Sequence, residues 1–493
     1  MKANLMYRDA DFNTAETACS GWETLAADLE LGHILAAMSR DDKVIQEACT
    51  AALSHPLTDL DVLRYRQENL NDALSNASAV RQLYAVTLET EKRRSGSWSW
   101  LGSHYISSTF SSAVNLLKIY TEMLMKLRAV ADESLSNFRY EGFRNLLTML
   151  QKELSDDYFH TVTDELNDLK EDRSVLISAT MGNRLQGVHY MLRQKDHKNF
   201  WRRWMFAPSF TIAARDDAGA RDLGARRDRA INESANALAQ SAEHLSGFFA
   251  MLRRELAFYV GCLNLADTLH QYGKLICIPD LQQMESRSRQ WQELYDVSLV
   301  LIKQGAAVGN SLRGDNKHLY LITGANQGGK STFLRSLGQA QIMAQCGMFV
   351  GAQSCSIPIR AGIFSHFKKE EDGSMTSGKL DEELVRMSGI VAQLKPNSMI
   401  LFNESFAATN EREGSEICRQ ITSALIENEI EVFSVTHLYP YAAAFLQDER
   451  TQYWRAQRTD SGERTFRLIE GKPLQTAFGE DLYERIFAAK SRV

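Results

Sequence analysis

The chain has 493 residues, too many for one ordinary hydrophobic core, so we expect two to four domains. Its 56 basic and 62 acidic residues give a net charge of −6, which argues against a wholly basic DNA-coating protein but leaves room for a local basic stripe. The seven scattered cysteines form no C-x-x-C pair and no apolar run approaches about 18 residues, so we expect free thiols, no membrane partner and a cytoplasmic location.

Residues 1 to 300 are predicted to be mostly helical, because only three of the seven prolines precede residue 300. Apolar residues keep a helical spacing at 26–88, 110–154 and 228–272. The first stretch is broken at His55-Pro56. Three β-like runs stand between the last two stretches, at 174–179, 187–192 and 209–213. They predict a small strand-bearing insertion at about 172–215.

From about residue 310 onward, short apolar runs alternate with helical segments. The predicted strands are 319–323, 363–367, 399–402, 432–435, 452–458 and 464–469. The predicted helices are 330–345, 379–393, 411–428 and 480–489. This alternation indicates a mostly parallel sheet with helices on its faces. A hairpin turn at 460–463 should close an antiparallel edge.

The segment from Gly324 to Ser331 reads G-x-x-x-x-G-K-S and stands between a predicted strand and a predicted helix. That context is typical of a phosphate-binding P-loop, in which glycines let backbone N–H groups surround a polyphosphate. Lys330 would reach the β- and γ-phosphates and Ser331 would ligate Mg²⁺. The predicted ATP-binding residues are Gly324, Ala325, Asn326, Gln327, Gly328, Gly329, Lys330, Ser331 and Thr332.

A second strand should deliver polar groups to the same site. Asn403 and Glu404 follow the apolar run 399–402, at the end of a strand where ligands gather in open α/β sheets. We expect Asn403 to hold Mg²⁺ through a water, without the charge of the usual aspartate, and Glu404 to be the general base. The alternative is that the two residues only cap the next loop. His437 ends the following strand and is either a γ-phosphate sensor or a structural residue.

These motifs resemble those of the MutS family of DNA mismatch repair ATPases. The segment 323–332 is similar to the family's TGxNxGGKST, and 403–414 to its DEIGRGTSTxDG block. Thr436-His437 matches its TH pair, and 346–352 resembles its GCFVPA segment. In the helical half, 55–67 and 255–258 resemble the core and the returning lever.

The resemblance implies an α/β P-loop ATPase domain of the ABC-like class, preceded by a long α-helical core and lever domain with a small β-containing clamp insertion. The expected domains are 1–171 (core and outgoing lever), 172–215 (clamp), 216–300 (returning lever helices) and 301–493 (ATPase). It also implies ATP and Mg²⁺ as cofactors, a homodimer formed through the ATPase domain, and DNA as a partner. We expect a short form without the mismatch-recognition and connector domains. The family's GxSTF segment, which carries a serine acting across the dimer, has only a poor match at 378–382.

The expected clamp carries a basic and aromatic stretch with Arg193, Lys195, Lys198, Trp201, Arg202, Arg203 and Trp204. Basic residues bind phosphates and tryptophan stacks on bases, so this stretch is either a nucleic-acid contact or a solvated face with packed tryptophans.

Three functions fit the sequence. The first is an ATP-driven DNA clamp acting in repair or recombination rather than in direct mismatch reading. The second is an ATP-binding dimerisation switch with little hydrolysis, and the third is binding to RNA or a ribosome.

Overall fold

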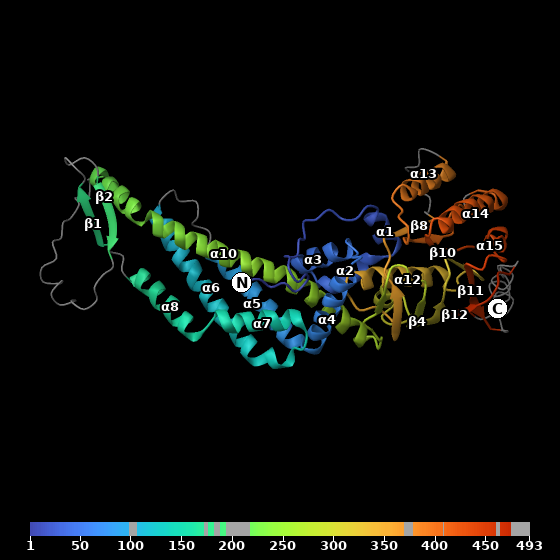
Figure 1. Ribbon diagram of the computed structural model, residues 1–493, viewed down its shortest axis with the longest axis horizontal. Helices are drawn as coiled ribbons and strands as arrows, with labels where there is room; N and C mark the ends of the chain where they lie inside the picture. The colour runs from blue at the N-terminus through green and yellow to red at the C-terminus, as the bar shows by residue number, and fades with distance from the viewer. Residues whose placement is uncertain are drawn as a thin grey trace, which may run out of the picture. The chain divides into compact units, whose positions relative to one another are not determined.

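The computed structural model describes residues 1–97, 106–171, 176–181, 188–193, 217–368, 378–407, 409–459 and 464–474 (Figure 1). The chain divides into two compact units. The first consists of Met1–Ala3, Ser78–Arg139 and Phe143–Arg253, and the second of Asn4–Ala77, Tyr140–Gly142 and Arg254–Val493.

The first unit is mainly helical. Its elements are α5 (Ala77–Ser97), α6 (Ile106–Ser134), η2 (Leu135–Asn137), α7 (Glu141–Glu153), α8 (Asp156–Glu171) and the first part of α10 (Asp217–Gln271). Aromatic packing joins α6 to α10, where Tyr120 and Phe249 stack with ring centroids 5.7 Å apart. Strands β1 (Leu176–Met181) and β2 (Val188–Arg193) pair antiparallel and confirm two of the strands predicted for the insertion. The third, at 209–213, lies outside the described residues.

The second unit begins with four helices. They are α1 (Trp22–Asp28), α2 (Leu31–Ser39), α3 (Lys43–Leu53) and α4 (Leu60–Ser75). Aspartates start α3 and α4, since Asp42 and Asp59 accept hydrogen bonds from the first free N–H groups of these helices. The end of α10 packs against α3, and Gly261 allows this approach because a Cβ there would lie 2.5 Å from Cys49 Sγ.

The main sheet of the second unit has the order β12-β11-β6-β10-β9-β8. Its strands are β6 (Leu319–Thr323), β8 (Ile363–Phe367), β9 (Met399–Asn403), β10 (Glu431–Val435), β11 (Thr451–Arg458) and β12 (Arg464–Glu470). Neighbouring strands are parallel apart from β11 and β12, which pair antiparallel at the edge. The mixed α/β fold predicted from the alternating pattern is therefore confirmed, while the turn predicted at 460–463 lies outside the described residues.

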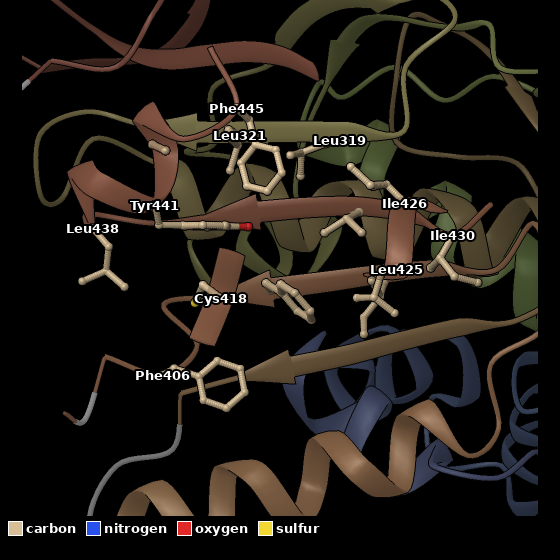
Figure 2. Packing of buried hydrophobic residues seen from close by; sticks show 14 of the residues in the cluster. Leu319, Leu321, Phe406, Cys418, Leu425, Ile426, Ile430, Leu438, Tyr441 and Phe445 are labelled. Carbon is tan, nitrogen blue, oxygen red and sulfur yellow. The ribbon is translucent and has the colours of Figure 1, made fainter. Parts of the chain in front are cut away.

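Helices cover both faces of this sheet. They are α12 (Lys330–Gln345), α13 (Lys379–Val391), α14 (Glu411–Glu427) and the short α15 (Tyr439–Ala443). Figure 2 shows the apolar core on one face, where Leu319 and Leu321 of β6 pack with residues of α14 and α15. On the other face, Tyr320 stacks on Trp454, and Trp454 meets Phe333 of α12. The helix predicted at 480–489 lies outside the described residues.

A second sheet was not predicted from the sequence. It has the order β3-β7-β4-β5, with β3 (Asp280–Gln282), β7 (Ser354–Pro358), β4 (Arg289–Leu294) and β5 (Asn310–Gly314). Two of these strands, β3 and β4, fall in 216–300, where only helices were expected, and they are followed by the short helix α11 (Val297–Ile302). The sheet packs against the first, since Trp291 of β4 and Trp454 of β11 meet edge to face at 6.1 Å.

Among the described residues, no helix combines the length and the apolar character that crossing a membrane requires.

Candidate ATP site

The loop between β6 and α12 is held tightly against β11. Gly324 and Gly329 have φ values of +113° and +88°, which residues other than glycine rarely adopt. A Cβ on Gly328 would lie 2.7 Å from the Ala456 Cβ, so a larger residue would push the loop off the sheet. The glycines of the motif thus allow the chain to turn sharply from strand to helix while lying close to another strand.

A cavity of about 1050 Å³ opens above this loop. Its lining includes the predicted residues Asn326, Gln327, Gly328, Gly329, Lys330, Ser331, Thr332, Glu404 and His437. The carbonyl groups of the other predicted loop residues, Gly324 and Ala325, contact the Lys330 side chain. Asn403 contacts Ser331. The structure therefore brings together residues that stand up to about a hundred positions apart in the sequence, because parallel strands end at one edge of the sheet.

Lys330 places a buried ammonium group at the base of the cavity. Its side chain is 5% exposed, and Nζ donates to the carbonyl oxygens of Gly324 and Ala325 at 3.0 Å each. Burial lowers the pKa of Lys330, while the nearby Glu404 acts in the opposite direction. Within the described part of the chain no carboxylate pairs with this ammonium, so its charge is available to an anion.

Ser331 and Asn403 form the oxygen pair at which Mg²⁺ is expected. Ser331 Oγ donates to Asn403 Oδ1 at 2.8 Å. Both groups are neutral oxygen ligands, the type that Mg²⁺ accepts when phosphates and waters complete its shell. No cluster of three His, Cys, Asp or Glu side chains suited to a metal is found among the described residues. The pair thus fits an ion that is carried in with a polyphosphate rather than one held by the protein alone.

Glu404 and His437 face each other at the cavity wall. The His437 Nδ1 and Glu404 Oε1 atoms are 3.7 Å apart, and both side chains are about one-third exposed, at 39% and 32%. The contact with His437 holds the pKa of Glu404 below its ordinary value, against the opposing effect of partial burial. An ionised carboxylate within reach of solvent is what a group that orients water requires.

Sequence reasoning missed the apolar wall of the cavity. It is formed by Leu294, Tyr295, Leu299, Val308 and Phe466. Phe466 is 49% exposed and has a φ of +57°, an unusual conformation for an aromatic residue. These residues come from segments without a common motif, and only the packing of the second sheet and of β12 against the loop places them here.

Comparison with known proteins decides the family. Two family models match the chain, the MutS2 N-terminal domain over residues 58–272 and MutS domain V over residues 320–470. The chain belongs to the MutS family. The second model covers nearly all of the main sheet and the loop, Asn403, Glu404 and His437 of the candidate site.

Individual relatives agree with this assignment. Endonuclease MutS2 of Lacticaseibacillus casei (strain BL23) is 29% identical over 247 residues, which are 48% of this chain and 31% of that protein. Endonuclease MutS2 of Streptococcus sanguinis (strain SK36) is 24% identical over 361 residues, 70% of this chain and 43% of that protein. DNA mismatch repair protein MutS of Bacillus subtilis (strain 168) is 32% identical over 125 residues, 25% of this chain and 15% of that protein. The chain therefore spans less than half of the length of these curated MutS relatives.

Two sequence predictions about this MutS-family chain concern segments that border on residues outside the described part, the basic stretch after β2 and the segment 378–382. Arg193 is the last residue of β2, while Lys195, Lys198, Arg202 and Arg203 of the basic stretch lie outside them. The segment 378–382, compared above with GxSTF, caps and begins α13, with Asp381 and Glu382 in its first turn. The nucleic-acid contact and the completion of a neighbour's site both stay predictions.

Proposed function

We propose that this MutS-family chain is a Mg²⁺-dependent ATPase that binds DNA as a dimeric clamp, with ATP binding and hydrolysis switching its conformation. We place its work in DNA repair or recombination in the cytoplasm. One observation carries the enzymatic part: the P-loop, Glu404 and His437 line one cavity that holds the buried ammonium of Lys330, and Asn403 contacts the P-loop at Ser331. A polyphosphate chain supplies the negative charge that this arrangement lacks.

Each group then has a role set by its position. The loop N–H groups at the start of α12 and the Lys330 ammonium bind phosphate oxygens. Ser331 and Asn403 hold the hydrated metal through neutral oxygens. Mg²⁺, when bound with ATP, would neutralise part of the phosphate charge. Glu404 orients the attacking water, and His437, 3.7 Å away, keeps that carboxylate ionised and senses the terminal phosphate.

The DNA-binding part rests on family membership and on two features of the chain. The matching relatives carry the names endonuclease and DNA mismatch repair protein. Long helices and the β1–β2 hairpin form a compact unit separate from the unit with the candidate ATP site. We propose that this unit is the arm that contacts DNA. We further propose that two copies associate through their ATPase domains.

The second candidate is an ATP-binding switch that hardly hydrolyses ATP. Asn403 favours it, because an amide brings no negative charge to the metal and weakens its hold. The two candidates share every binding role and differ only in turnover.

The deciding experiment compares wild type with Lys330→Ala and Glu404→Gln. Phosphate release and nucleotide binding are measured with and without a panel of DNA and RNA structures, together with the mass of the particle in solution. We expect Lys330→Ala to lose nucleotide binding and Glu404→Gln to bind ATP but to turn it over about 100-fold more slowly. Glu416→Gln is the matched control, since this glutamate lies exposed on α14 and pairs with Arg419.

The outcomes separate the candidates. DNA-stimulated turnover in a dimer supports the clamp. A wild type no faster than Glu404→Gln, with intact ATP binding, excludes hydrolysis and leaves the switch. Stimulation by RNA alone would contradict DNA as the partner.

A further inference from the structure

We propose that Ser405 and His366 are positioning residues for Glu404: they fix the turn that follows β9 and thereby aim the Glu404 carboxylate into the cavity. This inference rests on the proposed function, in which Glu404 orients the attacking water. It adds two residues that belong neither to the P-loop nor to the cavity lining.

The turn is conformationally unfavourable by itself. Glu404 and Phe406 have φ values of +53° and +56°, and neither is a glycine. Left-handed backbone at bulky residues persists only where surrounding contacts hold it, and such residues collect at functional sites. One such contact is the hydrogen bond from the Glu404 N–H to the Val435 carbonyl at 2.9 Å. Ser405 and Phe406 make further contacts.

His366 of β8 provides them. Its Nδ1 lies 2.8 Å from Ser405 Oγ, and Ser405 Oγ also donates to the His366 carbonyl at 2.7 Å. The imidazole ring stacks on Phe406 with centroids 5.2 Å apart. One side chain therefore contacts both residues that follow the proposed base.

The same ring connects the turn to α13. His366 Nε2 lies 3.1 Å from the Glu383 carbonyl and 3.3 Å from Arg386 Nη2. With the proton on Nδ1, Nδ1 donates to Ser405 Oγ, the Ser405 hydroxyl donates to the His366 carbonyl, and Nε2 accepts from Arg386. With the proton on Nε2, Nε2 donates to the Glu383 carbonyl, and Nδ1 accepts the Ser405 proton in place of the His366 carbonyl. Burial, with the charge of Arg386, lowers the pKa of His366 to about 4, so the ring is neutral near pH 7. The link between α13 and the turn is thus present under ordinary conditions.

On its other side, the turn packs against α14. Cys418 Sγ lies 3.4 Å from the Ser405 carbonyl, and a Cβ on Gly414 would lie only 2.4 Å from the Phe406 carbonyl. The backbone of 404–406 is therefore enclosed between β8, α13 and α14. A Glu404 side chain on an enclosed turn has a fixed direction, which is the property that efficient orientation of water requires.

Packing alone does not account for a serine and a histidine here. Ser405 and His366 are 5% and 1% exposed, and two apolar side chains would fill the same space without the cost of burying polar groups. Directional hydrogen bonds supply what apolar contacts do not, a single orientation of the turn.

The first test is Ser405→Ala. We expect kcat for ATP hydrolysis to fall about tenfold with KM for ATP near that of wild type, because a small misplacement of the base slows the chemical step and leaves phosphate binding intact. Ser398→Ala is the matched control: this serine is 1% exposed, immediately precedes the same strand, and accepts a backbone hydrogen bond from Lys395. It should lower the thermal midpoint similarly and leave kcat unchanged.

The second test is the double variant. If Ser405 acts through Glu404, Ser405→Ala should not slow the Glu404→Gln enzyme any further. His366→Phe gives a second route, since it keeps a ring against Phe406 and removes both nitrogens; it should reproduce the loss in kcat. A folded Ser405→Ala or His366→Phe enzyme with wild-type kcat overturns the inference, as does a further tenfold loss on top of Glu404→Gln. If wild type itself is no faster than Glu404→Gln, the proposed function fails and this inference with it, whereas the first two results leave the proposed function standing.

Discussion

Asn403 is the residue at which the site differs most from the acidic pattern of its family. Its amide oxygen accepts a hydrogen bond from Ser331 at 2.8 Å and adds no charge to the site. A carboxylate in the same place would attract a divalent cation directly, so we expect the identity of this one residue to affect the metal requirement of the proposed ATPase.

The variant Asn403→Asp tests this effect. We expect the Mg²⁺ concentration for half-maximal ATP hydrolysis to fall about tenfold, because changing one group beside a metal commonly changes the metal affinity about tenfold or more. A Mg²⁺ titration of phosphate release measures it. Asn428→Asp, at the far end of α14, is the control for added charge alone. An unchanged titration would remove Asn403 from the metal's surroundings.

Glu404 and His437 make a prediction about pH. The contact with His437 lowers the pKa of Glu404. The carboxylate therefore stays ionised at the ordinary pKa of a glutamate, and it stops acting as a base only when the pH falls through the lowered pKa. In His437→Asn this contact disappears, burial is opposed only by the charges of Lys330 and Lys368, and the pKa of Glu404 rises from its wild-type value. The acid limb of the kcat/KM profile should therefore move to higher pH. A limb at the wild-type position would show that His437 does not control the ionisation of Glu404.

At the scale of elements, a buried ion cluster joins the two sheets. Glu431 opens β10 and is fully buried; it accepts from Arg289 of β4 at 2.7 Å and from Arg360, which follows β7, at 2.8 Å. Burial by itself raises the pKa of Glu431, but the two guanidinium groups overcome this effect and hold it below the ordinary value. The single Glu431 carboxylate of the main sheet thus pairs with two buried guanidinium groups, one from β4 and one that follows β7.

Removing that charge should be costly. We expect Glu431→Gln to lower the free energy of unfolding by about 3 kcal/mol, because two buried guanidinium groups lose their counter-charge. Urea unfolding measures the change. In the exposed control Glu416→Gln, we expect little effect, since water screens the pair with Arg419. Equal stabilities for the two variants would contradict a structural role of the cluster.

The same scale shows what could be predicted from the sequence. The strands of the main sheet lie within one residue of their predicted bounds, because buried parallel strands read as apolar runs between helical segments. The second sheet was missed because its strands do not look apolar. In β4 the inward positions include Arg289, whose burial depends on Glu431, a residue more than a hundred positions away. A pattern of apolar and polar residues has no means of showing a buried charge.

At the scale of the whole molecule, DNA binding should depend on the basic stretch that follows β2 in the sequence. We expect Arg202→Ala combined with Arg203→Ala to reduce the slope of log affinity against log salt by about 0.9 for each DNA phosphate that the variant no longer neutralises. Filter binding over a salt series measures the slope. Arg419→Ala combined with Arg450→Ala is the control, because both arginines pair with carboxylates in the ATPase half. An unchanged slope would remove this stretch from the DNA surface.

The sequence by itself determined the glycine-rich loop and the main sheet, because both follow from local rules: glycines where the backbone must turn sharply, and apolar runs where strands are buried on both faces. It also placed Asn403, Glu404 and His437 at strand ends. Only the tertiary structure decided which groups complete the site. The apolar wall of the cavity, the Arg289–Glu431–Arg360 cluster and the His366–Ser405 link are contacts between segments far apart in the chain, and their energies depend on burial that no local pattern reveals.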